Sequence, residues 1–312
     1  MVRVISAEEI KDLDKSAVKS ALAKAFAGLI TGASVQPVQT LTEFPGGAGD
    51  VVFYPGALVE LGVVGVKVSP YLSALAKAGK PPVTAYTLLL SVETGEPILL
   101  CDSLRLTTIR TAATTALAVD YLAPASARRL AIFGAGNVAQ EHLAFALHQR
   151  SWGSVSVFAR SLSSNVDGAE ARRAGLIAKF GPIDFPDTSD GAAEGADVIM
   201  LCTSSGTPVL SSDSVLSATV VTSISTNARN AHEIDPRLLA SVDVYCDYRA
   251  TAPTTAGDFV LAAEQHGWDP SSIVGDLAEL AGGVVTPPES GRTRFFRSTG
   301  LGIEDLTVAT LL

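Results

Sequence analysis

Cysteine is scarce in this sequence, and its distribution argues against two classes of protein. The chain of 312 residues has three cysteines, Cys101, Cys202 and Cys246, which are widely spaced and lie in apolar runs. Disulfide scaffolds and zinc sites use paired or clustered cysteines. The four histidines form neither an H-x-H nor an H-E-x-x-H pattern, so we expect no metal. We expect buried free thiols in a reducing compartment, which favours a cytoplasmic protein.

Basic charge and long apolar runs are also lacking. Lysine and arginine number 23 against 32 acidic residues, for a net charge of −9 without a basic stripe, which argues against nucleic acid as a partner. No apolar run reaches the roughly 18–20 residues that cross a bilayer. No basic segment followed by an apolar run marks an N-terminal secretory signal. We therefore expect neither a membrane nor a nucleic-acid partner.

Apolar residues are plentiful, and their pattern predicts an α/β protein. They make up 47% of the chain, and charged residues only 18%, which is typical of a folded and well-buried protein. A chain of 312 residues is too long for one small core, so two domains are expected.

Residues 129–140 have the pattern of a strand, a glycine turn and the start of a helix. A short apolar run ends at Gly134, and a helical pattern follows Gly136, in the spacing G-x-G-x-x-A with Ala139 as the third small residue. Gly134 permits a tight turn, and Gly136 lets backbone N–H groups approach a pyrophosphate at the helix N-terminus. The alternative is a glycine turn in another α/β unit. The expected cofactor-binding residues are Gly134, Ala135, Gly136, Asn137 and Val138.

The segments before this turn predict a helix and a mostly antiparallel sheet. Ser6 and Glu9 have the spacing of a capping box, which predicts an amphipathic helix that starts there and ends at Gly32. The strand-like segments are residues 35–40, 51–53, 63–68, 83–92 and 97–101, and the last two flank a hairpin turn. A long helix is expected over residues 108–122.

Strands and helices alternate beyond the glycine turn. Strands are expected at residues 155–159, 197–202, 219–224 and 242–246, and the tail, residues 294–312, resumes a strand and then a helix. Such alternation of apolar strands predicts a Rossmann-type, doubly wound parallel sheet.

Two loops suggest how a cofactor binds. Arg160, followed by Ser161, ends the second strand of the nucleotide unit, where an NAD site usually has Asp or Glu. Arginine with small hydroxyls suits a 2′-phosphate instead, which favours NADP(H) over NAD(H); the alternative is a solvated surface arginine. Thr203 and Ser204 follow another strand and could reach the nicotinamide half, or form an ordinary turn. We also expect Ser298 to contact the cofactor.

Two cationic residues are candidates for catalysis. Arg110 is expected at a helix N-terminus, where a cation opposes the helix dipole, and this suggests that it grips a substrate carboxylate. Its alternative is a surface ion pair. Lys67 interrupts an apolar strand; if buried it would have a lowered pKa and could donate a proton near neutrality. Its alternative is a strand-end lysine with its head in water.

Several motifs together resemble the ornithine cyclodeaminase/μ-crystallin family. They keep their order and spacing over nearly the whole chain. The resembling pieces are Gly65-Val66-Lys67, Glu93-Thr94-Gly95-Glu96-Pro97, Arg110-Thr111-Ala112-Ala113, Gly134-Ala135-Gly136, Cys202-Thr203-Ser204, Pro208-Val209, Glu233-Ile234-Asp235, Ser298-Thr299-Gly300 and Glu304-Asp305-Leu306.

The resemblance implies a homodimeric enzyme that uses NAD(P)(H) at the carbon–nitrogen bond of small imino or amino acids. It implies that Lys67 is the catalytic lysine, that Arg110 binds the carboxylate, and that Thr111 helps to hold the pyrophosphate. It also implies a discontinuous α+β substrate-binding and dimerisation domain, residues 1–115 and 297–312, around a dinucleotide-binding Rossmann domain, residues 116–296.

Two positions depart from the family pattern. Gln39 stands where many members have a second carboxylate-binding arginine, and an amide supplies no charged fork. Asn227 stands where cyclodeaminases have an aspartate, and an amide cannot act as a base. Both positions are expected to line the substrate site. The change at Asn227 weakens ornithine cyclodeamination.

The leading hypothesis is therefore an NAD(P)-dependent ketimine reductase or amino-acid dehydrogenase. Two alternatives remain: an ammonia-releasing ornithine cyclodeaminase, and a crystallin-like protein that binds NADPH without turnover.

Overall fold

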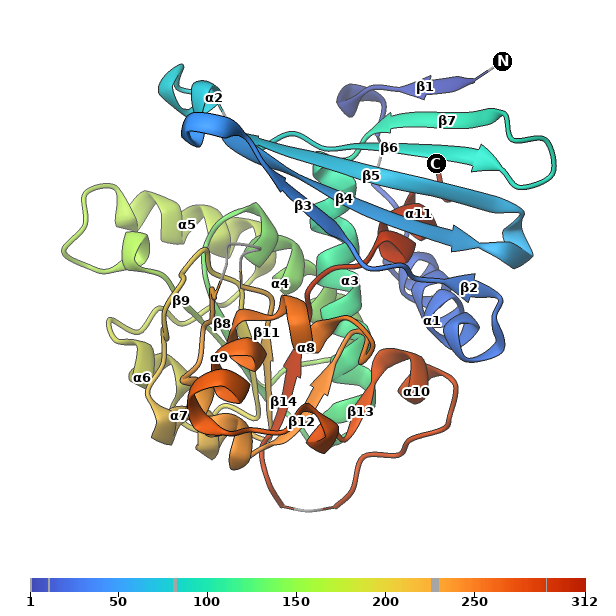
Figure 1. Ribbon diagram of the computed structural model, residues 1–312. Coiled ribbons are helices and arrows are strands. Elements are labelled where there is room, and N and C mark those ends of the chain that lie inside the picture. The colour runs from blue at the N-terminus through green and yellow to red at the C-terminus, as the bar shows by residue number, and fades with distance from the viewer. Residues whose placement is uncertain (1, 11, 81–82, 226–229, 290) are drawn as a thin grey trace. The chain divides into compact units, whose positions relative to one another are not determined.

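The computed structural model describes residues 2–10, 12–80, 83–225, 230–289 and 291–312 (Figure 1). The chain forms two compact units, Met1–Arg110 with Gly300–Leu312, and Thr111–Thr299. The first unit is thus discontinuous in sequence, because the C-terminal tail returns to it. No helix in the described ranges is long and apolar enough to cross a membrane.

The first unit is built on a seven-stranded sheet. The strand order is β1-β7-β6-β5-β4-β2, with β3 also paired to β4. β1 is parallel to β7, and the other pairs are antiparallel. The strands are β1 (Arg3–Ile5), β2 (Ser34–Val35), β3 (Thr40–Glu43), β4 (Gly49–Leu58), β5 (Val63–Leu72), β6 (Tyr86–Ser91) and β7 (Pro97–Asp102). Its helices and turns are η1 (Ala7–Glu9), α1 (Lys15–Thr31), η2 (Pro45–Gly47), η3 (Val59–Leu61), α2 (Ser73–Lys77) and α11 (Gly302–Ala309).

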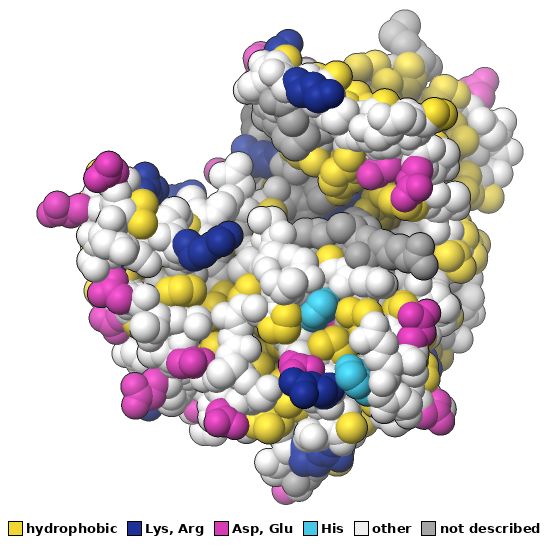
Figure 2. Space-filling view, turned by 60° about the vertical axis from the view of Figure 1, so that its left-hand side comes forward, with side chains coloured by type: hydrophobic (Ala, Val, Ile, Leu, Met, Phe, Trp, Pro, Cys, Tyr) yellow, Lys and Arg dark blue, Asp and Glu magenta, His cyan; other side chains and the backbone are white. Residues whose placement is uncertain are grey.

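The two faces of this sheet differ in burial. In β5, Val63, Lys67 and Ser69 are buried, whereas the alternate residue Val64 is exposed, as expected from the two-residue period of a strand. Helix α11 packs on β4 and β5, and α1 packs on α11. The other face is apolar and open to solvent, and Figure 2 shows hydrophobic side chains at the surface of this unit. Its exposed members are Val4, Phe53, Val64, Tyr86, Ile98 and Leu100; we call them the open sheet face.

Two helix starts differ from the sequence-based prediction. The capping box of Ser6 and Glu9 forms, but it closes only the turn η1, because the chain becomes extended at Ile10 (φ −74°, ψ 107°). Asp14 caps α1 instead, with its carboxylate accepting a hydrogen bond from the Ala17 N–H at 2.7 Å. The predicted end at Gly32 is confirmed, since this glycine adopts a left-handed conformation with φ 81°. α3 (Leu104–Leu122) begins earlier than residue 108.

The predicted strand over residues 35–40 is split into β2 and β3. Between them, the buried Gln36 donates from Nε2 to the Pro37 carbonyl at 2.6 Å, and Pro37 has no backbone N–H to give to a neighbouring strand. The predicted hairpin is confirmed by the antiparallel pairing of β6 and β7.

The second unit is a wholly parallel sheet with helices. Its strand order is β13-β12-β14-β11-β10-β8-β9, so the tail strand β14 inserts between β11 and β12. This confirms the predicted doubly wound sheet. The strands are β8 (Arg129–Phe133), β9 (Ser154–Phe158), β10 (Val198–Leu201), β11 (Val220–Ser223), β12 (Asp243–Cys246), β13 (Gly275–Asp276) and β14 (Arg294–Arg297). The helices and turns are α4 (Asn137–Gln149), η4 (Arg160–Leu162), α5 (Ala169–Phe180), α6 (Ser189–Ala193), α7 (Ser212–Ser217), η5 (Pro236–Ala240), α8 (Ala252–Thr255), α9 (Gly257–His266), η6 (Pro270–Ser272) and α10 (Leu277–Ala281).

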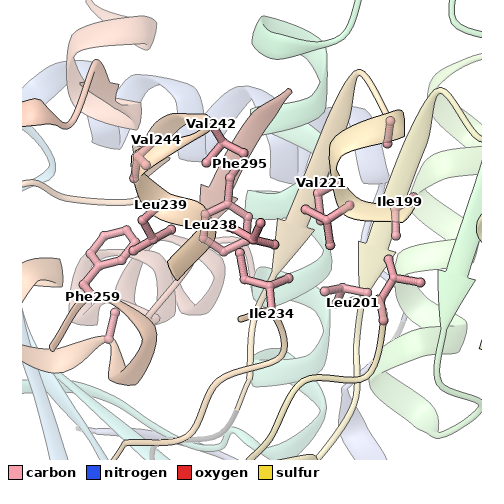
Figure 3. Close-up of a cluster of buried hydrophobic side chains, with 14 of the residues drawn as sticks. Ile199, Leu201, Val221, Ile234, Leu238, Leu239, Val242, Val244, Phe259 and Phe295 are labelled. Carbon is pink, nitrogen blue, oxygen red and sulfur yellow. The ribbon is translucent and has the colours of Figure 1, made fainter. Parts of the chain in front are cut away.

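The core of the second unit follows from strand register. Ile199, Val221 and Phe295 lie opposite one another on neighbouring strands, and Figure 3 shows them in one apolar cluster with Phe259 of α9. Burial of each such side chain contributes roughly 1.5–3 kcal/mol. The parallel strands of this sheet place the loops at their carboxyl ends along one edge.

All three cysteines are buried and free, as the sequence predicts.

Candidate active site

The glycine turn between β8 and α4 is shaped to receive a phosphate group. Gly134 has φ +123°, and a Cβ there would lie 2.5 Å from the Cys202 carbonyl oxygen, so only glycine fits. At Gly136 a Cβ would meet nothing within 4 Å, which leaves open space beside the helix N-terminus. Gly136 is the N-cap of α4 and has no capping side chain. The first N–H groups of Asn137 and Val138 therefore suit the pyrophosphate of a dinucleotide.

Arg160 and Ser161 stand in the turn η4, which follows β9. Both side chains are exposed, and the Arg160 guanidinium has no protein partner among the described residues. Arg172 of α5, which the sequence analysis did not select, donates from Nε to the Ser161 carbonyl at 3.0 Å. The turn therefore presents cationic side chains and an exposed hydroxyl, and it carries no carboxylate of its own.

The loop with Thr203 and Ser204 follows β10 and is held by Glu233. The fully buried Glu233 accepts hydrogen bonds at Oε1 from the Thr203 N–H and Oγ1, at 2.8 and 2.7 Å. Its Oε2 accepts from Ser223 Oγ at 2.8 Å and from the Ser225 N–H at 2.9 Å. One carboxylate thus fixes the loops that follow two neighbouring strands. Ser204 is exposed.

Ser298 is also tied to a buried carboxylate. Its hydroxyl donates to Asp247 Oδ2 at 3.3 Å, and Thr299 Oγ1 donates to the same carboxylate. The contacts of Asp247 with Ser298 and Thr299 link the carboxyl ends of β12 and β14.

Thr111 lies within α3, where its carbonyl accepts a hydrogen bond from Thr115 Oγ1 at 3.1 Å.

Lys67 is buried in the first unit, with 1% of its side chain exposed. Its Nζ lies 3.0 and 2.9 Å from the two carboxylate oxygens of Asp305. It also lies 3.4 Å from Thr107 Oγ1 and 4.1 Å from the centre of the Tyr54 ring. The strand-end alternative for Lys67, with its head in water, is therefore wrong.

Arg110 joins the same cluster. Its Nε donates to Asp305 Oδ1 at 3.0 Å, and its Nη1 donates to Glu304 Oε2 at 2.9 Å. Arg110 lies inside α3 rather than at its N-terminus, so the argument from the helix dipole was wrong. Gly300 makes room for this guanidinium, because a Cβ there would lie 2.5 Å from Arg110 Nη1. We call Lys67, Arg110, Glu304 and Asp305 the charged cluster.

Burial governs the charges of this cluster. Desolvation, and then repulsion by Arg110, lower the pKa of Lys67 from 10.5 to about 8, while Asp305 and Glu304 act in the opposite direction. Burial also opposes the charge of Arg110, but Asp305 and Glu304 hold its pKa above the usual value. Lys67 can therefore exchange a proton near neutral pH, whereas Arg110 stays charged.

The two departures from the family pattern have different outcomes. Gln39 is half-buried, and its Oε1 is a buried acceptor without a hydrogen-bond partner in the described part of the chain. It directly precedes β3, whose Thr40 pairs with Phe53 of β4. Asn227 lies outside the described residues.

Glu304 and Asp305 enter the sequence analysis only as part of a resembling motif, without a catalytic or binding role. The structure places Glu304 against Arg110, and Asp305 against both Arg110 and Lys67. A signal was present in the sequence: they form an adjacent acidic pair in segment 301–309, where Thr307 is the only other polar side chain. In the structure every residue of this segment is buried. Buried charges require partners of opposite sign.

The second unit defines a dinucleotide-binding α/β protein of the Rossmann type. The chain belongs to the ornithine cyclodeaminase/mu-crystallin family, whose model matches residues 1–312.

Relatives with known activities match over the full length. The NAD(P)H-dependent anabolic L-arginine dehydrogenase DauB of Pseudomonas aeruginosa is 46% identical over 312 residues, covering 100% of this chain and 96% of the relative. The ketimine reductase mu-crystallin of Mus musculus is 26% identical over 314 residues, covering 99% and 95%. The structure of Thermococcus litoralis Δ1-pyrroline-2-carboxylate reductase in complex with NADH and L-proline is similar with a TM-score of 0.90 and 26% identity, covering 99% and 96%. The chain is an NAD(P)-dependent oxidoreductase that acts on carbon–nitrogen bonds.

Proposed function

We propose that this enzyme reduces the C=N bond of an imino acid, and oxidises the corresponding amino acid, with Lys67 and Arg110 as its catalytic pair. The observation that carries the proposal is the burial of an ionisable lysine beside an arginine in the charged cluster. Two buried cations held by carboxylates are costly to maintain, and a lysine with a pKa of about 8 is suited to proton transfer at neutral pH.

Arg110 is proposed to bind the substrate carboxylate. Its contacts with Asp305 and Glu304 use Nε and Nη1, and a guanidinium has more N–H donors than these contacts require. Lys67 is proposed to give a proton to the substrate nitrogen during reduction and to take it back during oxidation. When bound, NAD(P)H supplies the hydride.

We propose NADP(H) as the preferred cofactor. An exposed arginine after β9, with Ser161 beside it and Arg172 anchored to the same turn, supplies positive charge and a hydroxyl for a 2′-phosphate. Gly134, Ala135, Gly136, Asn137 and Val138 are proposed to cradle the pyrophosphate, with Thr111, Thr203, Ser204 and Ser298 as further contacts.

L-Arginine, with its imino acid, is the substrate that we propose first. The support is the 46% identity to an L-arginine dehydrogenase over the whole chain. Gln39 fits this choice, because its unpartnered Oε1 can accept a hydrogen bond from a cationic substrate, whereas an arginine there would repel one.

We further propose that the enzyme is a homodimer that pairs through the open sheet face. An exposed apolar surface of this kind marks a protein–protein contact in a water-soluble protein. Pairing through one face of a single unit also gives the two-fold symmetry that most homodimers have.

The proposed activity is tested by following NADPH absorbance with the 2-oxo acid of arginine and ammonium, which form the imino acid in solution. Δ1-Pyrroline-2-carboxylate is tested in parallel as a cyclic imine. We expect NADPH consumption and formation of L-arginine. Absence of NADPH consumption with both substrates would overturn the proposal.

A further inference from the structure

Helix α11 brings two carboxylates into a buried site that already holds two cations. Glu304 and Asp305 are 0% and 1% exposed. With Lys67 and Arg110, they make up two positive and two negative groups. Removing any one of the four leaves an unbalanced charge in a region of low dielectric.

Asp305 differs from Glu304 in what it contacts. Its Oδ1 lies 3.0 Å from both Lys67 Nζ and Arg110 Nε, and its Oδ2 lies 2.9 Å from Lys67 Nζ. Glu304 contacts Arg110 at 2.9 Å. Asp305 therefore contacts both members of the proposed catalytic pair.

The backbone of α11 fixes where this carboxylate stands. A Cβ on Gly302 would lie 2.0 Å from the Pro55 carbonyl oxygen, and one on Gly56 would lie 2.9 Å from the Ile303 nitrogen. The helix start therefore packs directly on the β4 backbone. Gln36 Oε1 also accepts a hydrogen bond from the Ile303 N–H at 3.0 Å. These contacts hold α11 against β4 and β5, with the Asp305 carboxylate beside Lys67.

We propose that Asp305 is a positioning residue that keeps Lys67 protonated and fixes the position of its ammonium group. Asp305 also holds the Arg110 guanidinium beside that group. This inference rests on the proposed function for its catalytic meaning, but the interaction itself can be measured without turnover. Asp305 does not touch the substrate in this account. It determines when Lys67 carries its proton and where that proton is delivered.

The other groups around Lys67 do not replace Asp305. The Tyr54 ring from β4 faces Nζ, and Thr107 Oγ1 from α3 lies 3.4 Å away. Arg110 repels the ammonium, while Glu304 favours it as a weaker influence than Asp305. Burial raises the pKa of Tyr54, so this ring stays neutral. Loss of Asp305 would leave Lys67 with a repelling arginine as its strongest charged neighbour.

The test is the titration of Lys67 in Asp305→Asn. The probe is the isotope-labelled ε-methylene resonance of Lys67, assigned by its absence in Lys67→Met. We expect Lys67 to titrate about one pH unit or more below the wild-type midpoint, because each unit reflects a lost interaction with the charged form. Asp12→Asn is the matched control, because Asp12 is 89% exposed and paired with Arg105 in the same unit. An Asp305→Asn midpoint equal to that of the wild type contradicts the proposal.

A kinetic readout accompanies the titration. The alkaline limb of kcat/KM for imine reduction should move to lower pH in Asp305→Asn, with at least a tenfold loss above pH 8. If Asp305→Asn does not fold, Asp305→Glu decides. Its carboxylate, displaced by one methylene, should lower both kcat and the Lys67 midpoint, and wild-type values of both would contradict the proposal. An enzyme that reduces no imine would overturn the proposed function while leaving the titration readable.

Discussion

Asp305 Oδ1 lies 3.0 Å from Lys67 Nζ, although the two residues are separated by 238 positions in the chain. The contact requires the C-terminal tail to return to the first unit, because α11 packs on the strand that carries Lys67. The discontinuity of this unit is thus a requirement of its charged cluster. The same contact also favours the charged form of Lys67, since Asp305 opposes the burial that would otherwise lower the pKa of Lys67 further.

Arg110→Lys tests recognition of the substrate carboxylate. Lysine keeps the charge but loses the planar fork, so KM for the carboxylate substrate should rise about 10- to 100-fold, the value of one charge-assisted hydrogen bond. Arg105→Lys, at a half-exposed arginine of the same helix, should leave KM unchanged. An unchanged KM in a folded Arg110→Lys enzyme would contradict the proposal that Arg110 binds the substrate carboxylate.

Two glycines in one turn should respond differently to alanine. Gly136→Ala adds a Cβ into open space at φ −74°, so thermal stability should stay near that of the wild type. NADPH affinity should fall about tenfold or more, because the added methyl group would stand where we propose that the pyrophosphate binds. Gly134→Ala adds a Cβ 2.5 Å from the Cys202 oxygen at φ +123° and should lower the free energy of unfolding by about 2 kcal/mol or more. Thermal melts and NADPH fluorescence titrations measure both. Full NADPH affinity in Gly136→Ala would refute this reading of the turn.

Arg160→Ala tests the cofactor preference. Loss of one charged contact to a 2′-phosphate should raise KM for NADPH about 10- to 100-fold, while KM for NADH changes little, since NADH has no such phosphate. Arg237→Ala, at an exposed arginine paired with Asp235, is the control. Equal effects on both cofactors would show that Arg160 does not contact a 2′-phosphate.

His142 predicts a dependence of stability on pH. Burial lowers its pKa from 6.5 to about 4, and its Nε2 lies 3.0 Å from Thr115 Oγ1. The unfolded chain therefore binds the proton first as the pH falls, and stability is lost between about pH 6.5 and 4, by about 3 kcal/mol in total. Urea unfolding at pH 7 and pH 4.5 should show a smaller loss in His142→Gln than in the wild type. Equal losses would contradict this assignment.

Local patterns predicted the parts of the fold that depend on short stretches of chain. The glycine turn, the hairpin before α3 and the alternating strands of the second unit each rest on residues close in sequence. The N-terminal capping box shows the limit of such patterns. Ser6 and Glu9 form it, but the chain becomes extended at Ile10, so the box closes only one turn. The helix α1 begins after Asp14, which is its N-cap residue.

The charged cluster could not be predicted in full from the sequence. Lys67 and Arg110 were each weighed against a solvent-exposed alternative, because burial depends on what packs on them. Their partners lie on α11, at the other end of the chain, and Glu233 likewise fixes the Thr203 loop from 30 residues away. Strand and helix periodicities carry no information about contacts at such separations.

The most direct test of the whole account is NADPH-dependent reduction of the imino acid formed from the 2-oxo acid of arginine and ammonium, compared between the wild type and Lys67→Met. A positioned proton donor contributes about 10²- to 10⁴-fold, so kcat should fall by that factor in Lys67→Met, with NADPH affinity unchanged. Lys24→Met, at an exposed lysine of α1, should keep wild-type activity. Reduction at the wild-type rate by a folded Lys67→Met enzyme would contradict the central claim that Lys67 delivers the proton.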